Sequence, residues 1–478
     1  MNDSKRPAHS VDAVPSHPTR VEMSRYAAVS DNDVRPMSDG SSGRRHRSLS
    51  WPLYLLLVYL GAITVFGKGP AYIAIGPVYW GEIVLAISLL WALRRWRRVV
   101  IRTARARILT LSICCFLVLG AVELIANYPV WGLDALRDSA VCYYSLFYFV
   151  GLAIASDSEQ KLHFCSRWKL FWIIAIPWAA AELITQYRFS GLAPDIGSHG
   201  SVLGSSGSEI AQSLGLGCLL LLSEDRRGRF LGTTARVAVA TIGLAVVASI
   251  QERGVKLAIL AAFIVLVAGN LFDRSPGRVF GRKLSAMLLI LMAVLATAIA
   301  SGVDIGTSLQ LDRFRGASLD NPDATVAFRT DWWSKLYEQV MERNQAFGLG
   351  FGENLADYNP DISNQSEAQN PLRSPHNYNM TVFSRLGLLG LLIWCTILLS
   401  GVFDPLWRLL SASTNAERAE AREKTFWVAA IVATWVNSSF GVLMEGPVMG
   451  IPFWLMLGLI TGQPYRTVNR AGSPTRPR

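Results

Sequence analysis

The sequence predicts an all-α membrane protein, a bundle of transmembrane helices that carries one large polar loop. Hydrophobic residues make up 51% of the 478 residues and charged residues only 17%, which is too apolar for a soluble globular domain. Apolar runs also recur along the chain, and roughly 20 such residues in a helix cross a bilayer core of about 30 Å. A single long polar stretch, 303–375, interrupts this pattern.

Charge and cysteine content exclude other classes of protein. The formal net charge of +11 does not indicate a nucleic-acid partner, because the arginines cluster between apolar runs and not on one basic face. The six cysteines lack metal-ligand spacing, and all but Cys165 lie inside apolar runs. We interpret them as small buried apolar residues and expect no disulfide, no metal and no cofactor.

The apolar runs divide the chain into tails, spans and one loop. Residues 1–49 are rich in Ser, Pro, Asp and Arg and are predicted to be a disordered tail, too long and polar to open a cleaved signal peptide. Nine spans are expected within 50–302 and three within 376–463, with a short tail at 464–478. The twelve candidates lie near 51–67, 72–93, 108–126, 139–155, 170–186, 210–222, 237–250, 255–272, 284–302, 378–403, 425–443 and 447–463.

The distribution of lysine and arginine predicts the orientation of these spans. If twelve spans alternate, the basic connections all fall on one side, among them the segment RRWRR at 94–98 and the connections near 226–236, 274–283 and 408–424. The positive-inside rule makes that side cytoplasmic, together with both tails. The polar loop at 303–375 is then outside the cytoplasm.

The polar loop is predicted to contain a helix followed by a glycine turn. Apolar residues recur with helical spacing at Phe328, Trp332, Leu336 and Val340, within the predicted helix 328–341. Such a helix could lie flat on the membrane with its tryptophans among the lipid headgroups, or pack on the spans. The glycines of the motif GLGFG then end the helix and turn the chain; no strand precedes them, so they are not a dinucleotide-binding motif.

Two of the six histidines fall on the predicted outer side of the membrane. His376 lies where the polar loop enters a span, and the titration range of imidazole suits proton transfer near neutral pH. The alternative is a histidine that caps the helix or belongs to the loop. His199 lies in a Gly/Ser-rich loop and is the weaker candidate.

Three arginines on the predicted outer side are candidate functional residues. Arg253 lies in the hairpin QERG between two spans, and a charge near bilayer depth normally faces protein, water or a ligand. The guanidinium fork suits phosphate, whereas snorkelling or a pair with Glu252 is the alternative. Arg329 precedes the tryptophan pair on the predicted loop helix, where it could simply be solvated. Arg385 directly precedes an apolar run and could be interfacial or point inward.

Four carboxylates lie toward the predicted outer ends of spans and could pair with these arginines. They are Glu82, Glu123, Glu182 and Glu209. The sequence contains no nucleotide-binding loop, so a reaction on the outer side would need an already activated donor, such as a lipid-linked diphosphate sugar.

The motif that closes the polar loop resembles that of the O-antigen ligase and O-antigen polymerase superfamily. These bacterial integral membrane glycosyltransferases use undecaprenyl-diphosphate-linked glycans. Members have a large periplasmic loop, then a His-Asn pair and a Gly-Leu-Leu-Gly-like turn, here His376, Asn377 and RLGLLG at 385–390. Many members have His-x-His-Asn where this chain has SPHN, which leaves the acceptor and the subfamily open.

Two upstream motifs extend the resemblance over about 140 residues, 251–390. The superfamily has an arginine and a tryptophan ahead of a Phe-Gly-x-Gly turn, here Arg329, the tryptophan pair at 332–333 and FGLG at 347–350. It also has an arginine before glycine in an earlier outward hairpin, which matches Arg253.

The resemblance implies a periplasmic glycosyl-transfer site in a multi-pass protein of the bacterial inner membrane. Arg253 and Arg329 would bind the diphosphate and stabilise the leaving charge, while His376 would act as general base on an acceptor hydroxyl. Transfer would proceed with inversion in a single displacement, without a metal. Supporting roles are expected for Asn377, Arg385 and Glu182.

The implied partners are the lipid-linked donor, a glycan or lipid acceptor, the bilayer and polysaccharide export machinery. A growing glycan as acceptor would make the protein a polymerase in O-antigen or exopolysaccharide synthesis, and a terminal lipid or protein would make it a ligase. A different class also fits the sequence, a transporter or flippase of a lipid-linked sugar or small anion. In that case Arg253 and the buried glutamates would line a path and His376 would be a gate.

Overall fold

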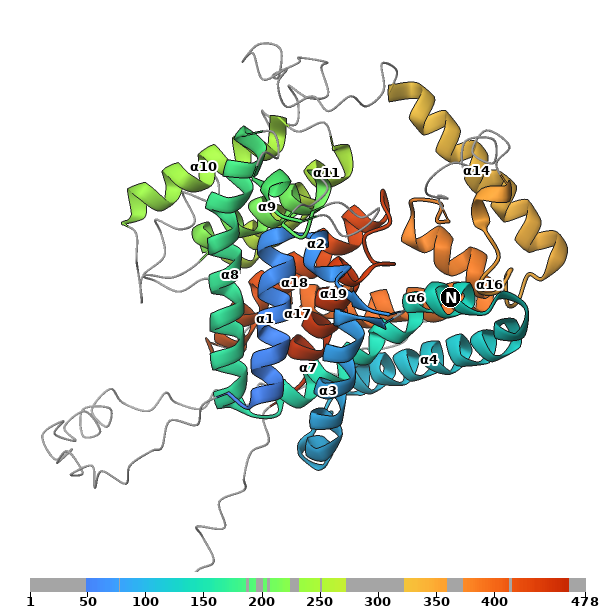
Figure 1. Ribbon diagram of the computed structural model, residues 1–478. Coiled ribbons are helices and arrows are strands. Elements are labelled where there is room, and N and C mark those ends of the chain that lie inside the picture. Colours follow the sequence, from blue (N-terminus) through green and yellow to red (C-terminus); the bar gives the residue numbers. More distant parts are fainter. Residues whose placement is uncertain are drawn as a thin grey trace, which may run out of the picture. The chain divides into compact units, whose positions relative to one another are not determined.

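The computed structural model describes residues 49–76, 78–185, 189–194, 201–203, 207–223, 232–249, 252–271, 322–358, 373–411 and 415–463. These residues are mostly helical and belong to one compact unit, Ser48–Arg478 (Figure 1). Residues 1–48 of the predicted tail, the ninth span at 284–302 and the tail at 464–478 lie outside the described residues.

Helices account for nearly every described element. The α-helices are α1 (Trp51–Phe66), α2 (Lys68–Ala71), α3 (Trp80–Arg95), α4 (Ala104–Trp131), α5 (Leu133–Asp138), α6 (Ala140–Tyr143), α7 (Phe147–Ala155), α8 (Ser158–Ile184), α9 (Gly207–Ser223), α10 (Thr233–Ser249), α11 (Arg253–Leu271), α14 (Pro322–Arg343), α16 (Tyr378–Leu398), α17 (Asp404–Ser411), α18 (Asn415–Ser438) and α19 (Pro447–Thr461). Short 3-10 turns occur at Trp96–Arg98, Tyr144–Leu146, Ser190–Leu192 and Leu355–Tyr358, and a π-helical turn occupies Leu399–Phe403.

Three described helical segments are long and apolar enough to cross a membrane. They are Ala104–Trp131, Leu133–Ala155 and Tyr378–Arg408. Shorter apolar helices occur at Trp51–Phe66, Ser208–Ser223, Thr234–Ala248 and Pro447–Thr461, each at a predicted span. The all-α class agrees with the sequence, while the count of twelve spans stays a prediction.

The predicted second span, 72–93, is wrong in its first third. A two-residue antiparallel hairpin precedes the helix there, with β1 (Ala74–Ile75) paired to β2 (Val78–Tyr79). Gly76 turns the hairpin with a φ of 63°, a left-handed conformation that glycine adopts without steric cost. The helix α3 therefore begins only at Trp80.

Close contacts between helix backbones organise the bundle. A Cβ added at Gly151 in α7 would lie 2.4 Å from the carbonyl oxygen of Leu455 in α19, so only glycine permits that approach. Small residues bring membrane helices together in the same way. Two further packed pairs, α11 with α18 and α4 with α16, include the helices that carry Arg253 and Arg385.

The helix α14 extends the predicted loop helix at both ends and packs on α16 (Figure 1). The side chains of Trp332, Leu336 and Val340 are fully buried and share a cluster with Phe383 of α16. The indole N–H of Trp332 donates to the carbonyl of Leu355, 2.9 Å away. The packed arrangement is therefore the one adopted, and Trp332 does not lie among lipid headgroups.

Candidate functional site

His376 stands immediately before α16 in a strained backbone conformation. Its φ of 55° makes it the only non-glycine residue with a positive φ in the part of the chain that the structure describes. Such a conformation costs about 1–3 kcal/mol and persists only where the surroundings enforce it. Burial, reinforced by the nearby positive charge of Arg329, lowers the pKa of His376 to about 4. The imidazole is thus neutral at pH 7 and can accept a proton.

Neighbouring groups hold the segment around His376 on both sides. The indole N–H of Trp333 donates to the carbonyl of Pro375 at 2.8 Å. The side-chain oxygen of Asn377 accepts from the amides of Asn379 and Met380, so Asn377 is the N-cap of α16. The capping role that sequence reasoning left open for His376 thus belongs to Asn377, and the imidazole is not used for it.

Arg329 projects from α14 toward the end of α18. Its Nη1 donates to the carbonyl oxygen of Phe440 at 3.1 Å. Burial lowers the pKa of Arg329, and the charge of Glu252 acts in the opposite direction. Arg329 therefore lies within electrostatic range of both His376 and the residue that precedes Arg253.

Arg253 is the first residue of α11, and its side chain is exposed. The next residue, Gly254, packs on the same Phe440 that binds Arg329, since an added Cβ would lie 2.9 Å from the Phe440 Cβ. The start of α11 and the arginine of α14 therefore meet around one residue, with His376 beside them. Three positions far apart in the sequence converge here.

Arg385 points inward and is almost completely buried. Its Nη2 lies 2.8 Å from Asp138 Oδ2, and its Nη1 donates to the carbonyl oxygens of Gly350 at 3.1 Å and Glu353 at 2.6 Å. Arg373 also donates to Asp138, at 3.1 Å. These bonds use both terminal nitrogens of the Arg385 guanidinium. Arg385 therefore has a structural role, in which it holds the carbonyls of the glycine turn.

The glycine turn at 348–352 docks directly on the backbone of α16. Gly348, Gly350 and Gly352 have φ values of 79°, 77° and 98°, as the predicted turn requires, although α14 itself already ends at Arg343. The amide of Leu349 donates to the carbonyl of Ser384 at 2.7 Å. This docking needs an interruption in the helix, which Gly387 supplies with a φ of 63° and a ψ of −160°.

The carboxylates of Glu82 and Glu123 bind neutral donors and not the candidate arginines. Glu82 accepts from the Tyr143 hydroxyl at 2.6 Å and from the Tyr79 amide at 2.9 Å. Glu123 accepts from the Asn127 side chain at 3.2 Å. Among the described residues, neither carboxylate therefore forms the pair with Arg253, Arg329 or Arg385 that the sequence left open.

The other sequence candidates belong to other elements. Glu182 is buried in α8, which packs chiefly on α9 and α1, and Glu209 is buried in the first turn of α9. His199 is outside the described residues.

Sequence reasoning missed Asp138, Arg373 and Glu445. Asp138 and Glu445 lie in short connections on the predicted outer side, next to spans. That position is the one signal that could have directed attention to them. Glu445 accepts from Ser374, two residues before His376, and from Thr381.

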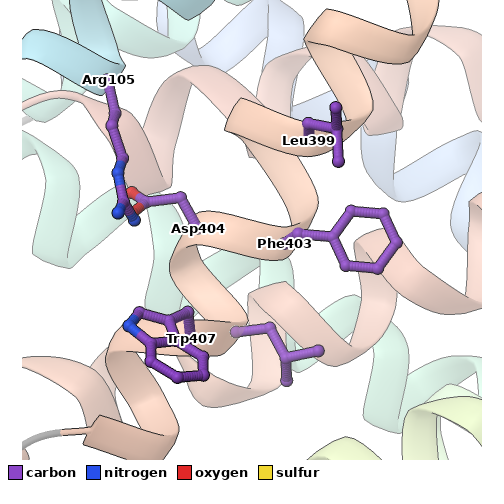
Figure 2. Close-up of a pocket in the computed structure, with 6 residues that line it drawn as sticks. Arg105, Leu399, Phe403, Asp404 and Trp407 are labelled. Carbon is purple, nitrogen blue, oxygen red and sulfur yellow. The ribbon is translucent and has the colours of Figure 1, made fainter.

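A separate cavity of about 310 Å³ lies next to the C-terminal end of α16, whereas His376 precedes its N-terminal end. Figure 2 shows Arg105 directed at Asp404, with Leu399, Phe403 and Trp407 around them. None of the candidate site residues lines it. Among the residues that the structure describes, no group of three or more His, Cys, Asp and Glu side chains could hold a metal ion.

The long apolar helices, with a polar site built at the ends of α11, α16 and α18, define an integral membrane protein. Residues 237–395 match the family described as O-antigen ligase, a stretch that includes Arg253, Arg329, His376 and Arg385. This match supports a relationship to the O-antigen ligase and polymerase superfamily and a role in cell-surface glycan assembly. A comparison with curated proteins found no match.

Proposed function

We propose that the protein transfers or polymerises an undecaprenyl-diphosphate-linked glycan on the periplasmic face of the bacterial inner membrane, with His376 as general base. The observation that carries this proposal is the position of His376, buried on a strained backbone beside Arg329 and the start of α11. The match of residues 237–395 to the O-antigen ligase family supports the reaction class.

The cationic side of the site suits a diphosphate. Arg329 uses one nitrogen on Phe440, which leaves further guanidinium donors for phosphate oxygens. Arg253 is exposed at the N-terminus of a 19-residue helix, where free amides and the helix dipole favour an anion. Both arginines would stabilise the charge that develops on the leaving lipid diphosphate.

His376 would take the proton of the acceptor hydroxyl. The acceptor oxygen forms a bond to the anomeric carbon as the bond from that carbon to the diphosphate oxygen breaks, and the diphosphate leaves with the electron pair. The proton passes to the neutral imidazole. Before donor binding, Arg329 disfavours the imidazolium. Because a bound diphosphate offsets that positive charge, donor binding raises the pKa of His376 and strengthens the base.

The test is transfer by purified protein in detergent, with a lipid-diphosphate-linked oligosaccharide as donor. A ladder of multiples on a gel would identify a polymerase, and one transfer that requires an added acceptor lipid would identify a ligase. His376→Ala should lower the rate by about 10²–10⁴-fold, the usual contribution of a general base. The matched control is His163→Ala in α8, which should leave the rate unchanged.

Two results would contradict the proposal. Full activity of a folded His376→Ala variant would exclude the imidazole as base. If no acceptor gives a new glycosidic bond, while liposomes containing the protein move the lipid-linked sugar unchanged, the protein is a transporter.

A further inference from the structure

A carboxylate bridges the two sides of His376. Glu445 lies in the connection between α18 and α19, and its Oε1 accepts from Ser374 Oγ at 2.5 Å and Thr381 Oγ1 at 2.7 Å. Ser374 precedes His376 by two residues, and Thr381 lies in the first turn of α16. One oxygen atom therefore ties the incoming chain to the helix that follows His376.

This bridge acts on the most strained non-glycine position described. The left-handed conformation of His376 would relax to a more common one if its flanks were free. The bond from Trp333 to Pro375 and the cap by Asn377 restrain the segment from α14 and from α16. Glu445 contacts both sides of His376 through short bonds, whereas the direct contact between the Ser374 and Thr381 hydroxyls is longer, at 3.4 Å.

We propose that Glu445 is a positioning residue for glycosyl transfer, which fixes the backbone of His376 and thereby the direction of its imidazole. The inference rests on the proposed function, because it concerns the base assigned there. Glu445 lies beyond the stretch that matches the family, so that match does not assign it a role.

The surroundings of Glu445 indicate that its acceptor atom matters more than its charge. Burial raises its pKa to about 7, opposed by the bonds from Ser374 and Thr381 and by the charge of Arg385. Asp138, Tyr378 and Tyr72 are the other titratable groups that interact with it. An oxygen of the carboxylate and the carbonyl oxygen of the protonated acid can each accept the two bonds. A glutamine should therefore replace Glu445 well, and an alanine should not.

The test compares four variants in the detergent assay: Glu445→Ala, Glu445→Gln, His376→Ala and the double variant His376→Ala/Glu445→Ala. We expect Glu445→Ala to lower kcat by about 10–100-fold, since misplacement by about 1 Å can cost 100-fold. The KM for the donor should stay within about twofold, because the arginines are untouched, and Glu445→Gln should keep kcat within about threefold. The double variant should be no slower than His376→Ala, because a residue that acts through the base has nothing left to position.

A matched control separates positioning from general stability. Glu82→Ala removes another carboxylate that accepts two hydrogen bonds, from Tyr143 and Tyr79, and should leave kcat unchanged. If Glu445→Ala does not fold, the pair Ser374→Ala/Thr381→Val removes the donors of the same bridge and should show the same loss of kcat.

The outcomes distinguish the two proposals. Full activity of His376→Ala overturns both, since no base is left to position. Loss of activity in His376→Ala, with a folded Glu445→Ala as active as the wild type, overturns only the role of Glu445. The same fold-loss from Glu445→Ala with and without His376 also overturns it, because the carboxylate would then act independently of the imidazole.

Discussion

The guanidinium of Arg385 lies 2.8 Å from the carboxylate of Asp138, and this buried ion pair joins α16 to the end of α5. The same guanidinium holds the carbonyls of Gly350 and Glu353, so the pair also anchors the glycine turn. Its side chains are only 2% and 13% exposed, so loss of Asp138 leaves the buried guanidinium of Arg385 without its carboxylate partner.

Substitution of Asp138 is therefore expected to destabilise the protein strongly. Removing one partner of a buried ion pair typically costs about 3–5 kcal/mol. Asp138→Ala should lower the midpoint of thermal unfolding in detergent, measured by tryptophan fluorescence. The control is Asp134→Ala, whose side chain is 44% exposed near Arg137 and Arg373 and should change stability little. Equal midpoints for the two variants would contradict this assignment.

A side chain at Gly387 should disturb the docking of the glycine turn. The residue has a φ of 63°, and an added Cβ would lie 2.5 Å from the backbone of Ala346. We expect Gly387→Ala to destabilise the folded state by at least about 1–3 kcal/mol, the usual cost of such backbone strain. Gly232→Ala is the control, because nothing lies within 4 Å of its Cβ position. Unchanged thermal unfolding of Gly387→Ala would contradict the close approach.

Substitutions of the two adjacent tryptophans of α14 are expected to have different effects. Trp332→Phe removes the buried bond to Leu355 and should cost about 1–3 kcal/mol of stability. Trp333→Phe removes the hydrogen bond to the carbonyl of Pro375, beside His376. It should lower kcat by about 10-fold, because a small displacement of a catalytic group can reduce the rate by that much or more. Parallel measurements of thermal unfolding and kcat check both. Loss of stability without loss of kcat in Trp333→Phe would exclude a role for that bond in positioning His376.

The pH dependence of the reaction should report the charge of Arg329. Since His376 must be neutral to act as base, kcat/KM should fall as the pH drops through the pKa of about 4 in the free enzyme. Arg329→Gln removes a positive charge that lowers this pKa, so the acidic limb should move upward. It should remain below 6.5, because burial is the larger cause of the shift. If the acidic limb of the pH profile does not move in Arg329→Gln, the group that titrates in that limb is not a His376 influenced by Arg329.

Local sequence patterns predicted the elements of this protein well. The periodic spacing of apolar residues is a local property, visible within a few turns of helix. Most described helices therefore coincide with a predicted span, and the spacing of Trp332, Leu336 and Val340 correctly predicted the buried face of α14. The positive φ values of Gly348 and Gly350 likewise follow from a property of glycine itself. The motifs around Arg329 and His376 were enough to indicate the superfamily, and the family match over 237–395 supports that prediction.

The partners of the polar side chains were decided only by the tertiary structure. Arg329 meets Phe440 across 111 residues and Ser374 meets Glu445 across 71, and no local period encodes such pairs. The inward direction of Arg385 depends on Asp138, which another helix supplies. A buried polar group must find a partner wherever packing brings one, so its choice depends on how the helices meet. The sequence could therefore specify which residues are candidates for the chemistry, and packing specified what holds them in place.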